Sequence, residues 1–182
     1  MKASEVASAL LVGVGSRLAH SAAVARQAMV VEPVLPRPWS AALVPAAWLH
    51  DVGYAPDLSV TGFHPLDGAR WLRSHGWPAE VCCLVAWHTR AQTEASLRAL
   101  LPELAGAFPR PPHDARAALA WADLTSSPTG ACCTIAERIE DILERYPRGS
   151  IVHRATTANR RALQEDVAWV ETMLDATLAV PA

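Results

Sequence analysis

Apolar residues recur every three or four positions along most of this chain, which is the spacing that places them on one face of an α-helix. Proline and glycine divide this pattern into segments, and no segment shows the alternation expected of a β-strand. The predicted helices cover residues 3–31, 40–53, 64–76 and 78–88, then helical material over 91–108 that Pro102 interrupts, and a helix that begins near residue 114. The sequence therefore predicts an all-α protein.

Two amphipathic segments follow, over residues 134–146 and 156–179. Each carries a narrow apolar stripe on an otherwise charged helix. The stripes consist of Ile135, Ile139, Ile142 and Tyr146, and of Leu163, Val167, Val170, Leu174 and Leu178. We interpret residues 128–182 as accessory helices packed on the outside of the core, an arrangement that is also compatible with a homodimer.

Composition narrows the range of partners. The 182 residues fit a single domain spanning 1–182, and 51% hydrophobic against 19% charged residues is typical of a globular protein. The formal net charge is −2, so composition gives little support for a basic face that would bind nucleic acid. A small phosphorylated substrate remains compatible with this balance, because bound metal ions would add positive charge that a residue count does not include.

The four cysteines form two adjacent pairs, Cys82-Cys83 and Cys132-Cys133. Neighbours on a helix point in different directions, and the spacing lacks the CxxC form of a structural zinc site. Both pairs lie in apolar stretches that we interpret as helical, so we expect small buried side chains. Reduced thiols suit a cytoplasmic protein, and no apolar run approaches the roughly 20 residues that span a bilayer.

Four histidines and two aspartates are candidate metal ligands. They are His20, His50, Asp51, His64, His88 and Asp123. His50 and Asp51 are about 100° apart on a helix, which still lets both reach an ion beside the helix end. Asp123 lies in an apolar context, where a lone carboxylate is costly without a partner. A single helical histidine is more often a hydrogen-bonded residue than a ligand, so the interpretation depends on the whole set.

Taken in order, these residues resemble the H…HD…D pattern of the HD-domain superfamily of metal-dependent phosphohydrolases, and His64 and His88 resemble the extra ligands of its two-metal branch. Their neighbours are similar as well. Residues 48–53 (WLHDVG) resemble the family's LHDIG, and residues 64–69 (HPLDGA) resemble its H…GA helix start. Residues 87–89 (WHT) and 122–124 (ADL) resemble its later segments. The resemblance covers about residues 17–127.

This resemblance implies a five-helix core within residues 17–127, with two divalent metal ions at its centre. His20, His50, Asp51 and Asp123 would hold one ion, and Asp51 would bridge to a second ion held by His64 and His88. Imidazole and carboxylate ligands suit Fe, Mn, Co, Ni or Zn. Such a pair can bind a bridging hydroxide and neutralise a phosphoryl group. We therefore expect a phosphohydrolase that cleaves a phosphate ester of a nucleotide or another small metabolite, with Asp51 central to catalysis.

One position departs from the family pattern. The family often has lysine directly after its HD-x-G run, and this chain has Tyr54 there. Tyrosine keeps a hydrogen-bond donor but loses a fixed positive charge. Phosphate binding would then depend on the metals and on Arg90, with Arg17 and Arg70 as further candidates, although each arginine alone is more often a solvated helix charge. Tyr54 and Arg90 are thus the predicted substrate contacts.

Two other functions stay open at this stage. Some two-metal members of the superfamily are di-iron oxygenases that act on a small polyol or phosphonate with the same ligands. A non-catalytic binding protein ranks last, because all six ligands are present. We expect the pocket walls to come from residues 55–63 and 90–112. Asp67, one turn after His64, is interpreted either as a carboxylate that orients that imidazole or as a first-turn helix charge.

Overall fold

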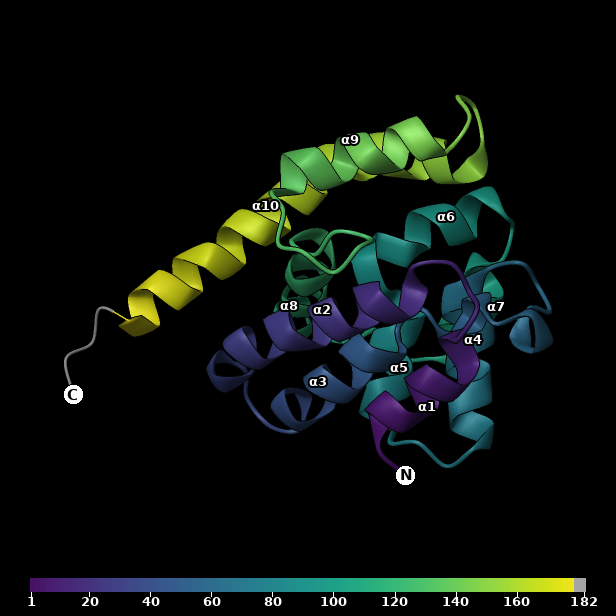
Figure 1. The fold of residues 1–182 in the computed structure, drawn as a ribbon, viewed down its shortest axis with the longest axis horizontal. Helices are drawn as coiled ribbons and strands as arrows, with labels where there is room; N and C mark the ends of the chain where they lie inside the picture. Colours follow the sequence, from purple (N-terminus) through teal and green to yellow (C-terminus); the bar gives the residue numbers. More distant parts are fainter. Residues whose placement is uncertain (179–182) are drawn as a thin grey trace.

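The computed structural model describes residues 1–178, and this part of the chain is built from α-helices joined by short loops and 3₁₀ turns (Figure 1). The prediction of an all-α protein is confirmed. In chain order the helices are α1 (Ala3–Leu11), α2 (Arg17–Val31), α3 (Trp39–Leu49), α4 (His64–Ser74), α5 (Ala79–Trp87), α6 (Ala91–Leu97), α7 (Leu101–Ala107), α8 (His113–Leu124), α9 (Ile135–Arg145) and α10 (Ile151–Leu178).

Helix α3 lies at the centre of the core. It packs against α1, α2, α5 and α8. Leu43, Ala46, Ala47 and Leu49 of this helix are fully buried. A helix that is apolar on all sides is stable only when neighbours surround it, and its alanines let those neighbours approach closely. The segment after α3, which begins with His50 and Asp51, therefore starts from a rigid position.

The predicted single helix over residues 3–31 is wrong, because the chain breaks between Leu11 and Arg17. Gly13 and Gly15 lie in this break with φ angles of +80° and +52°. Glycine adopts such angles without steric cost, whereas a continuing helix requires negative φ. The break turns α1 against α2 and leaves α2 free to begin at Arg17, one turn before His20.

The helix predicted over residues 40–53 ends earlier, at Leu49. Asp51 has φ −100° and ψ 2°, and a 3₁₀ turn over Val52–Tyr54 replaces the last helical turn. Gly53 is the last residue of the predicted helix, where glycine commonly has a positive φ, but its φ is not in the positive region. A Cβ built on Gly53 would lie 2.1 Å from the backbone oxygen of His64. Glycine is therefore required because the turn and the start of α4 are in direct backbone contact.

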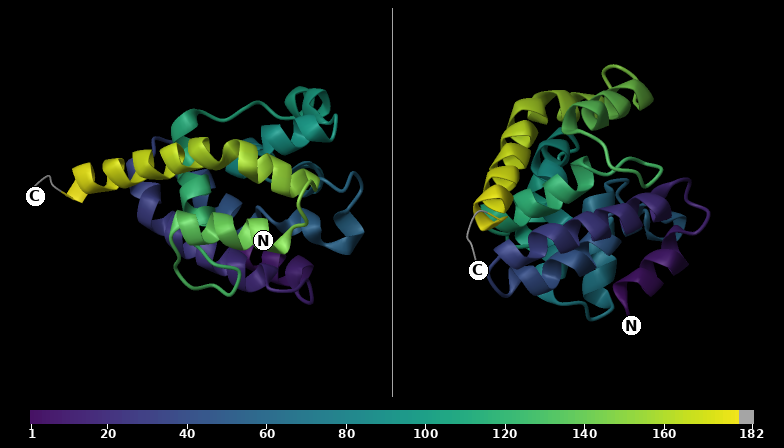
Figure 2. Two further views of the ribbon diagram at one scale, coloured as in Figure 1. Left: turned by 90° about the horizontal axis from the view of Figure 1, so that it is seen from above. Right: turned by 60° about the vertical axis from the view of Figure 1, so that its left-hand side comes forward.

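Helices α9 and α10 form an antiparallel hairpin along one side of the molecule (Figures 1 and 2). Thr134 caps α9, since its side chain accepts from the Glu137 backbone N–H and Glu137 reaches back to the Thr134 backbone. α10 begins at Ile151, five residues before the predicted start. Of its apolar stripe, Leu163, Val167 and Val170 are buried and Leu174 is half-buried, while the side chain of Leu178 lies outside the described part of the chain.

One of the two cysteine pairs lies in the loop between α8 and α9 and not in a helix, as was predicted for both pairs. Cys82 and Cys83 are buried in α5 as expected, and burial raises the pKa of the Cys82 thiol to about 11. Cys132 is exposed and Cys133 is half-buried, and both belong to the loop that precedes α9. Among the described residues, no helix has the length and apolar character needed to cross a membrane.

Candidate metal centre

The six predicted ligands lie together and divide into two groups. His20, His50 and Asp123 form one group, and Asp51, His64 and His88 form the other. Within each group the three potential ligand atoms lie within 4.8 Å of one another. His64 is half-buried and the other five residues are buried. The residues come from α2, the end of α3, the start of α4, the end of α5, and α8, so the tertiary structure assembles the cluster.

The orientation of two imidazoles is set by the helices that carry them. The Nδ1–H of His50 donates to the backbone oxygen of Ala47 at 2.8 Å, and that of His88 donates to Val85 at 2.7 Å. In each case the acceptor is a carbonyl in the last turn of the helix, where intrahelical donors run out. A neutral imidazole with Nδ1 protonated has a lone pair on Nε2. Both Nε2 lone pairs therefore face the shared space.

The imidazole of His20 is also held by a hydrogen bond to a backbone carbonyl, but that carbonyl lies outside the helix that carries His20. Its Nδ1–H donates to the backbone oxygen of Ser127 at 3.2 Å, in the loop after α8. Its Nε2 lies 3.0 Å from Oδ1 of Asp123. An imidazole lone pair beside a carboxylate oxygen is repulsive unless a proton or another cation lies between them. This pair therefore has the character of a cation site.

The Nε2 atoms of three more histidines also lack a well-suited partner unless a cation is bound. Nε2 of His50 is buried and has no hydrogen-bond partner among the described residues. Nε2 of His64 lies 3.2 Å from Nε2 of His88. Burial lowers the pKa of His64 well below its usual range, and the neighbouring His88 lowers it further, so this imidazole is neutral at pH 7. Orphaned, inward-facing imidazole nitrogens are what a nitrogen- and oxygen-liganded metal requires, so the residues fit such an ion.

Asp51 lies between the two groups. Its Oδ1 is 3.5 Å from Nε2 of His50 and 3.5 Å from Nε2 of His64. Its Oδ2 accepts a hydrogen bond from Nη1 of Arg17 at 2.8 Å. Burial would raise the pKa of Asp51, but His50 and the Arg17 guanidinium outweigh burial and hold this pKa well below its usual range. The carboxylate is therefore ionised, with one oxygen turned toward both histidine groups.

Tyr54 is packed between a cation and an imidazole. The Arg17 guanidinium lies 3.8 Å from the centre of the Tyr54 ring, and the opposite contact is a stacked His64 with 4.0 Å between ring centres. Burial raises the pKa of Tyr54 well above 10, although Arg17 opposes this shift. The phenol is therefore neutral. The Arg17 guanidinium therefore places a positive charge beside Tyr54, the residue that stands where the HD-domain pattern often has lysine.

Asp123 is fixed by three groups. Besides His20, the Thr89 hydroxyl donates to its Oδ2 at 2.6 Å, and Nη2 of Arg138 lies 3.7 Å from its Oδ1. Burial would raise the pKa of Asp123, but the adjacent His20 imidazole and the charges around it hold this pKa well below its usual range. Thr89 has a φ of 46°, which is costly for a β-branched residue and marks a segment constrained by its surroundings.

Arg90 lines the cavity, but its guanidinium is committed elsewhere. Its Nε and Nη2 donate to the two oxygens of buried Asp166 in α10, both at 2.7 Å, and His113 also contacts that carboxylate at 3.0 Å. This fork joins the segment after His88 to α10. Arg70, a further candidate, pairs with Glu103 on the surface instead.

Asp67 lies in the first turn of α4, as one of the two interpretations predicted, and it also binds the loop before that helix. Its carboxylate accepts from the backbone N–H groups of Val60 and Thr61 and from the Thr61 hydroxyl, at 2.9 to 3.1 Å. It therefore fixes the turn before α4. The position of His64 depends on Asp67 only through that turn.

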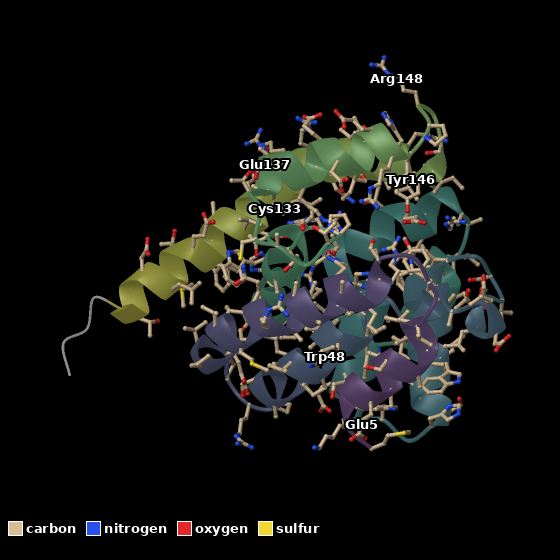
Figure 3. The ribbon with its side chains drawn as sticks, viewed as in Figure 1. Glu5, Trp48, Cys133, Glu137, Tyr146 and Arg148 are labelled. Atoms are coloured by element: carbon tan, nitrogen blue, oxygen red, sulfur yellow. The ribbon has the colours of Figure 1, made fainter. Side chains whose placement is uncertain are left out.

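The cluster opens into a cavity of about 120 Å³. The expected walls were residues 55–63 and 90–112, and this prediction is largely wrong: only Arg90, Ala91 and Glu94 from those ranges line the cavity. A large part of the remaining wall comes from the α9–α10 hairpin, through Arg138, Ile142, Arg145, Tyr146, Val152, Ala155, Thr156, Asn159 and Leu163. The hairpin is thus part of the site as well as an outer layer. Figure 3 shows Tyr146 on the side of α9 toward the body of the molecule, while Glu137 and Arg148 lie outward.

Arg138 is the site residue that sequence reasoning missed. It is 6% exposed and occupies the position between Ile135 and Ile139 on the apolar side of α9. A charged residue that falls on the apolar stripe of an amphipathic helix was the signal that could have found it.

In comparisons with known proteins, no family model, no curated protein and no solved structure matches this chain.

Proposed function

We propose that this protein is a metal-dependent phosphohydrolase of the HD-domain kind. The observation that carries the proposal is the convergence of six imidazole and carboxylate ligands, with an orphaned Nε2 on His50 at the centre. In this proposal the helices that supply the ligands, α2, α3, α4, α5 and α8, would form the five-helix core that the sequence resemblance implies. Helices α9 and α10 are additions to that core in this proposal.

The proposed ligand assignment follows the two groups. His20, His50, Asp51 and Asp123 would hold one ion, and Asp51, His64 and His88 would hold the second. The position of Asp51 supports a bridging role, because its Oδ1 is 3.5 Å from a histidine nitrogen of each group. Nitrogen and oxygen ligands of this kind suit Fe, Mn, Co, Ni or Zn.

Two bound divalent ions would supply Lewis acidity and a hydroxide nucleophile at neutral pH. Hydrolysis of a phosphate ester at such a site would give inorganic phosphate and an alcohol. The residues of the chain supply the setting for this step. Arg17 keeps Asp51 ionised, and Thr89 holds one oxygen of Asp123 so that the other faces His20. Burial of the cluster keeps bulk water away and strengthens each of these charges.

The test combines metal content with turnover. Protein purified without chelator is expected to hold about two divalent ions per chain, and to release inorganic phosphate from phosphomonoesters in the presence of manganese and the absence of oxygen. Asp51→Ala should lose both properties. Absence of stoichiometric metal, or full activity in the variant, would overturn the proposal.

A di-iron oxygenase shares the ligand set, and Tyr54 in place of the family lysine is the feature that favours it. The contact between Arg17 and Tyr54 weakens this argument, because a positive charge is present at that point. The two functions differ in their need for oxygen. Oxygen consumption that depends on a polyol or phosphonate, with an iron spectrum that changes on substrate addition, would favour the oxygenase over the hydrolase.

A further inference from the structure

Arg138 is a buried cation directed at the candidate metal centre from outside the five ligand-bearing helices. Its Nη2 lies 3.5 Å from Nε2 of His20 and 3.7 Å from Oδ1 of Asp123. It is carried by α9, and the surrounding stripe of isoleucines packs that helix against the body of the molecule. A buried guanidinium is costly unless its charge and its donors are satisfied. The groups that neutralise the charge of Arg138 and accept its hydrogen bonds therefore indicate its role.

The groups around Arg138 neutralise its charge and satisfy its hydrogen-bond donors only in part. Its Nη1 donates to Oδ2 of Asp141 at 2.9 Å, but the same oxygen also accepts from Nη2 of Arg145 at 2.6 Å. Two guanidinium groups thus share one carboxylate. The Nε of Arg138 is buried and has no hydrogen-bond partner among the described residues. The other nearby carboxylate, Asp123, would be engaged by a metal in the proposed function.

Arg17 and Arg90, which also line the cavity, differ in this respect. Arg17 has Asp51 as its own partner, and Arg90 has both oxygens of Asp166. Arg145 shares Asp141 with Arg138, but its side chain is exposed. Arg138 is therefore the buried arginine of the cavity with spare donor capacity. A guanidinium with free N–H groups beside a metal centre matches the charge and the donor geometry that a phosphate group requires.

We propose that Arg138 is the phosphate-binding residue of this cavity and that the α9–α10 hairpin is its specificity element. This inference rests on the proposed function and deepens it. Arg138 would hold the non-bridging oxygens of a terminal phosphate at the edge of the metal cluster, and the apolar side chains of Ile142 and Leu163 would contact the alcohol part of the substrate.

The size of the cavity limits the size of the alcohol group of the substrate. The cavity measures about 120 Å³. Cavities that enclose larger, drug-sized ligands measure about 300–1,000 Å³. The smaller cavity favours a small phosphomonoester, such as a phosphorylated polyol, over a nucleotide.

Binding of inorganic phosphate tests the role of Arg138 without depending on turnover. Isothermal titration of phosphate into the manganese-loaded protein should show at least about a tenfold loss of affinity in Arg138→Met, and partial recovery in Arg138→Lys, with metal content unchanged in both. The matched control is Arg160→Met. Arg160 belongs to the same hairpin, pairs with exposed Glu140, and does not line the cavity, so phosphate affinity should stay at the wild-type value. Wild-type affinity in Arg138→Met would overturn the inference.

A variant with the opposite expected effect covers the case in which Arg138→Met does not fold. Asp141 is 36% exposed in its side chain and shares its charge between two arginines. Asp141→Asn removes that compensation and leaves Arg138 more available, so phosphate affinity should increase. Unchanged or weaker phosphate binding by the folded variant would contradict the assignment.

The failures of the two proposals are distinguishable. A protein that holds no metal overturns the proposed function and this inference together. A protein that holds metal and hydrolyses phosphomonoesters, but whose phosphate affinity does not respond to Arg138, overturns this inference alone. Comparing kcat/KM for glycerol 2-phosphate and for adenosine monophosphate tests the size limit, and a higher value for the nucleotide would overturn that limit.

Discussion

The contact between Gly53 and the start of α4 gives a sharp prediction about Gly53→Ala. A Cβ at position 53 would lie 2.1 Å from the backbone oxygen of His64 and 2.8 Å from the backbone nitrogen of Gly68. Both atoms belong to the backbone of a helix, so neither can move away by changing a rotamer. The turn after Asp51 and the helix that begins at His64 would have to separate.

Overpacking of a core costs about 1–3 kcal/mol, and a clash with backbone belongs at the upper end of that range. For a chain of this length each kcal/mol lowers Tm by about 2–4 °C, so Gly53→Ala should lower Tm by about 6–12 °C. The separation would also move His64 away from His88, so metal content should fall. Thermal unfolding followed by circular dichroism, together with elemental analysis, measures both effects.

Gly106→Ala provides the matched control. Gly106 lies inside α7, and a Cβ built there would meet no atom within 4 Å. Alanine costs less than glycine in a helix, so this variant should be neutral or more stable by up to about 1 kcal/mol. If Gly53→Ala unfolds within about 2 °C of the wild type and keeps its metal, the packing argument at this glycine is refuted.

Three further predictions concern the ligands. Asp51→Asn should reduce phosphomonoesterase activity to background and lower metal content in elemental analysis, because one oxygen of Asp51 faces both histidine groups; retained two-metal stoichiometry would contradict this. Thr89→Val removes the hydroxyl that holds Asp123 but keeps the side-chain shape, so metal affinity in a chelator competition should fall about 10- to 100-fold, with little change in helical content. Burial lowers the pKa of His50 and His64 from the usual 6.5, so below that pH the unfolded chain binds more protons than the native chain, and metal-free protein should lose stability in urea as the pH falls from 7 toward 5. A His64→Gln variant should show a shallower slope, and an equal slope would argue against a buried neutral His64.

The candidate ligands were accessible from the sequence because their signals are local. His50 and Asp51 follow an apolar helix that must be central, and His64 stands one residue before a proline that begins a helix. Asp123 is a carboxylate inside an apolar segment. These local features mark the residues as candidates, but their interpretation as one ligand set depends on the whole ordered set and its resemblance to the HD-domain pattern.

The cavity was not accessible in this way, because its walls depend on where α9 and α10 return to the body of the molecule. That return is fixed by contacts distant in sequence, such as the fork between Arg90 and Asp166 and the hydrogen bond of Thr93 to Asn159. Gly53 illustrates the same limit. Its sequence context indicates a helix end, but its requirement for glycine comes from a second helix that lies against it.

The hydrogen bonds from His50 and His88 to Ala47 and Val85 have a consequence for how quickly the centre could load. Each imidazole is held by the helix that carries it, three residues back, so both nitrogens are in place before any ion arrives. The rate of metal uptake should then depend on access through the cavity and not on a rearrangement of these ligands. The same geometry also offers a transferable element for design. A histidine placed immediately after the last residue of a helix can use an otherwise unpaired carbonyl to fix its own tautomer, without a supporting residue from elsewhere in the fold.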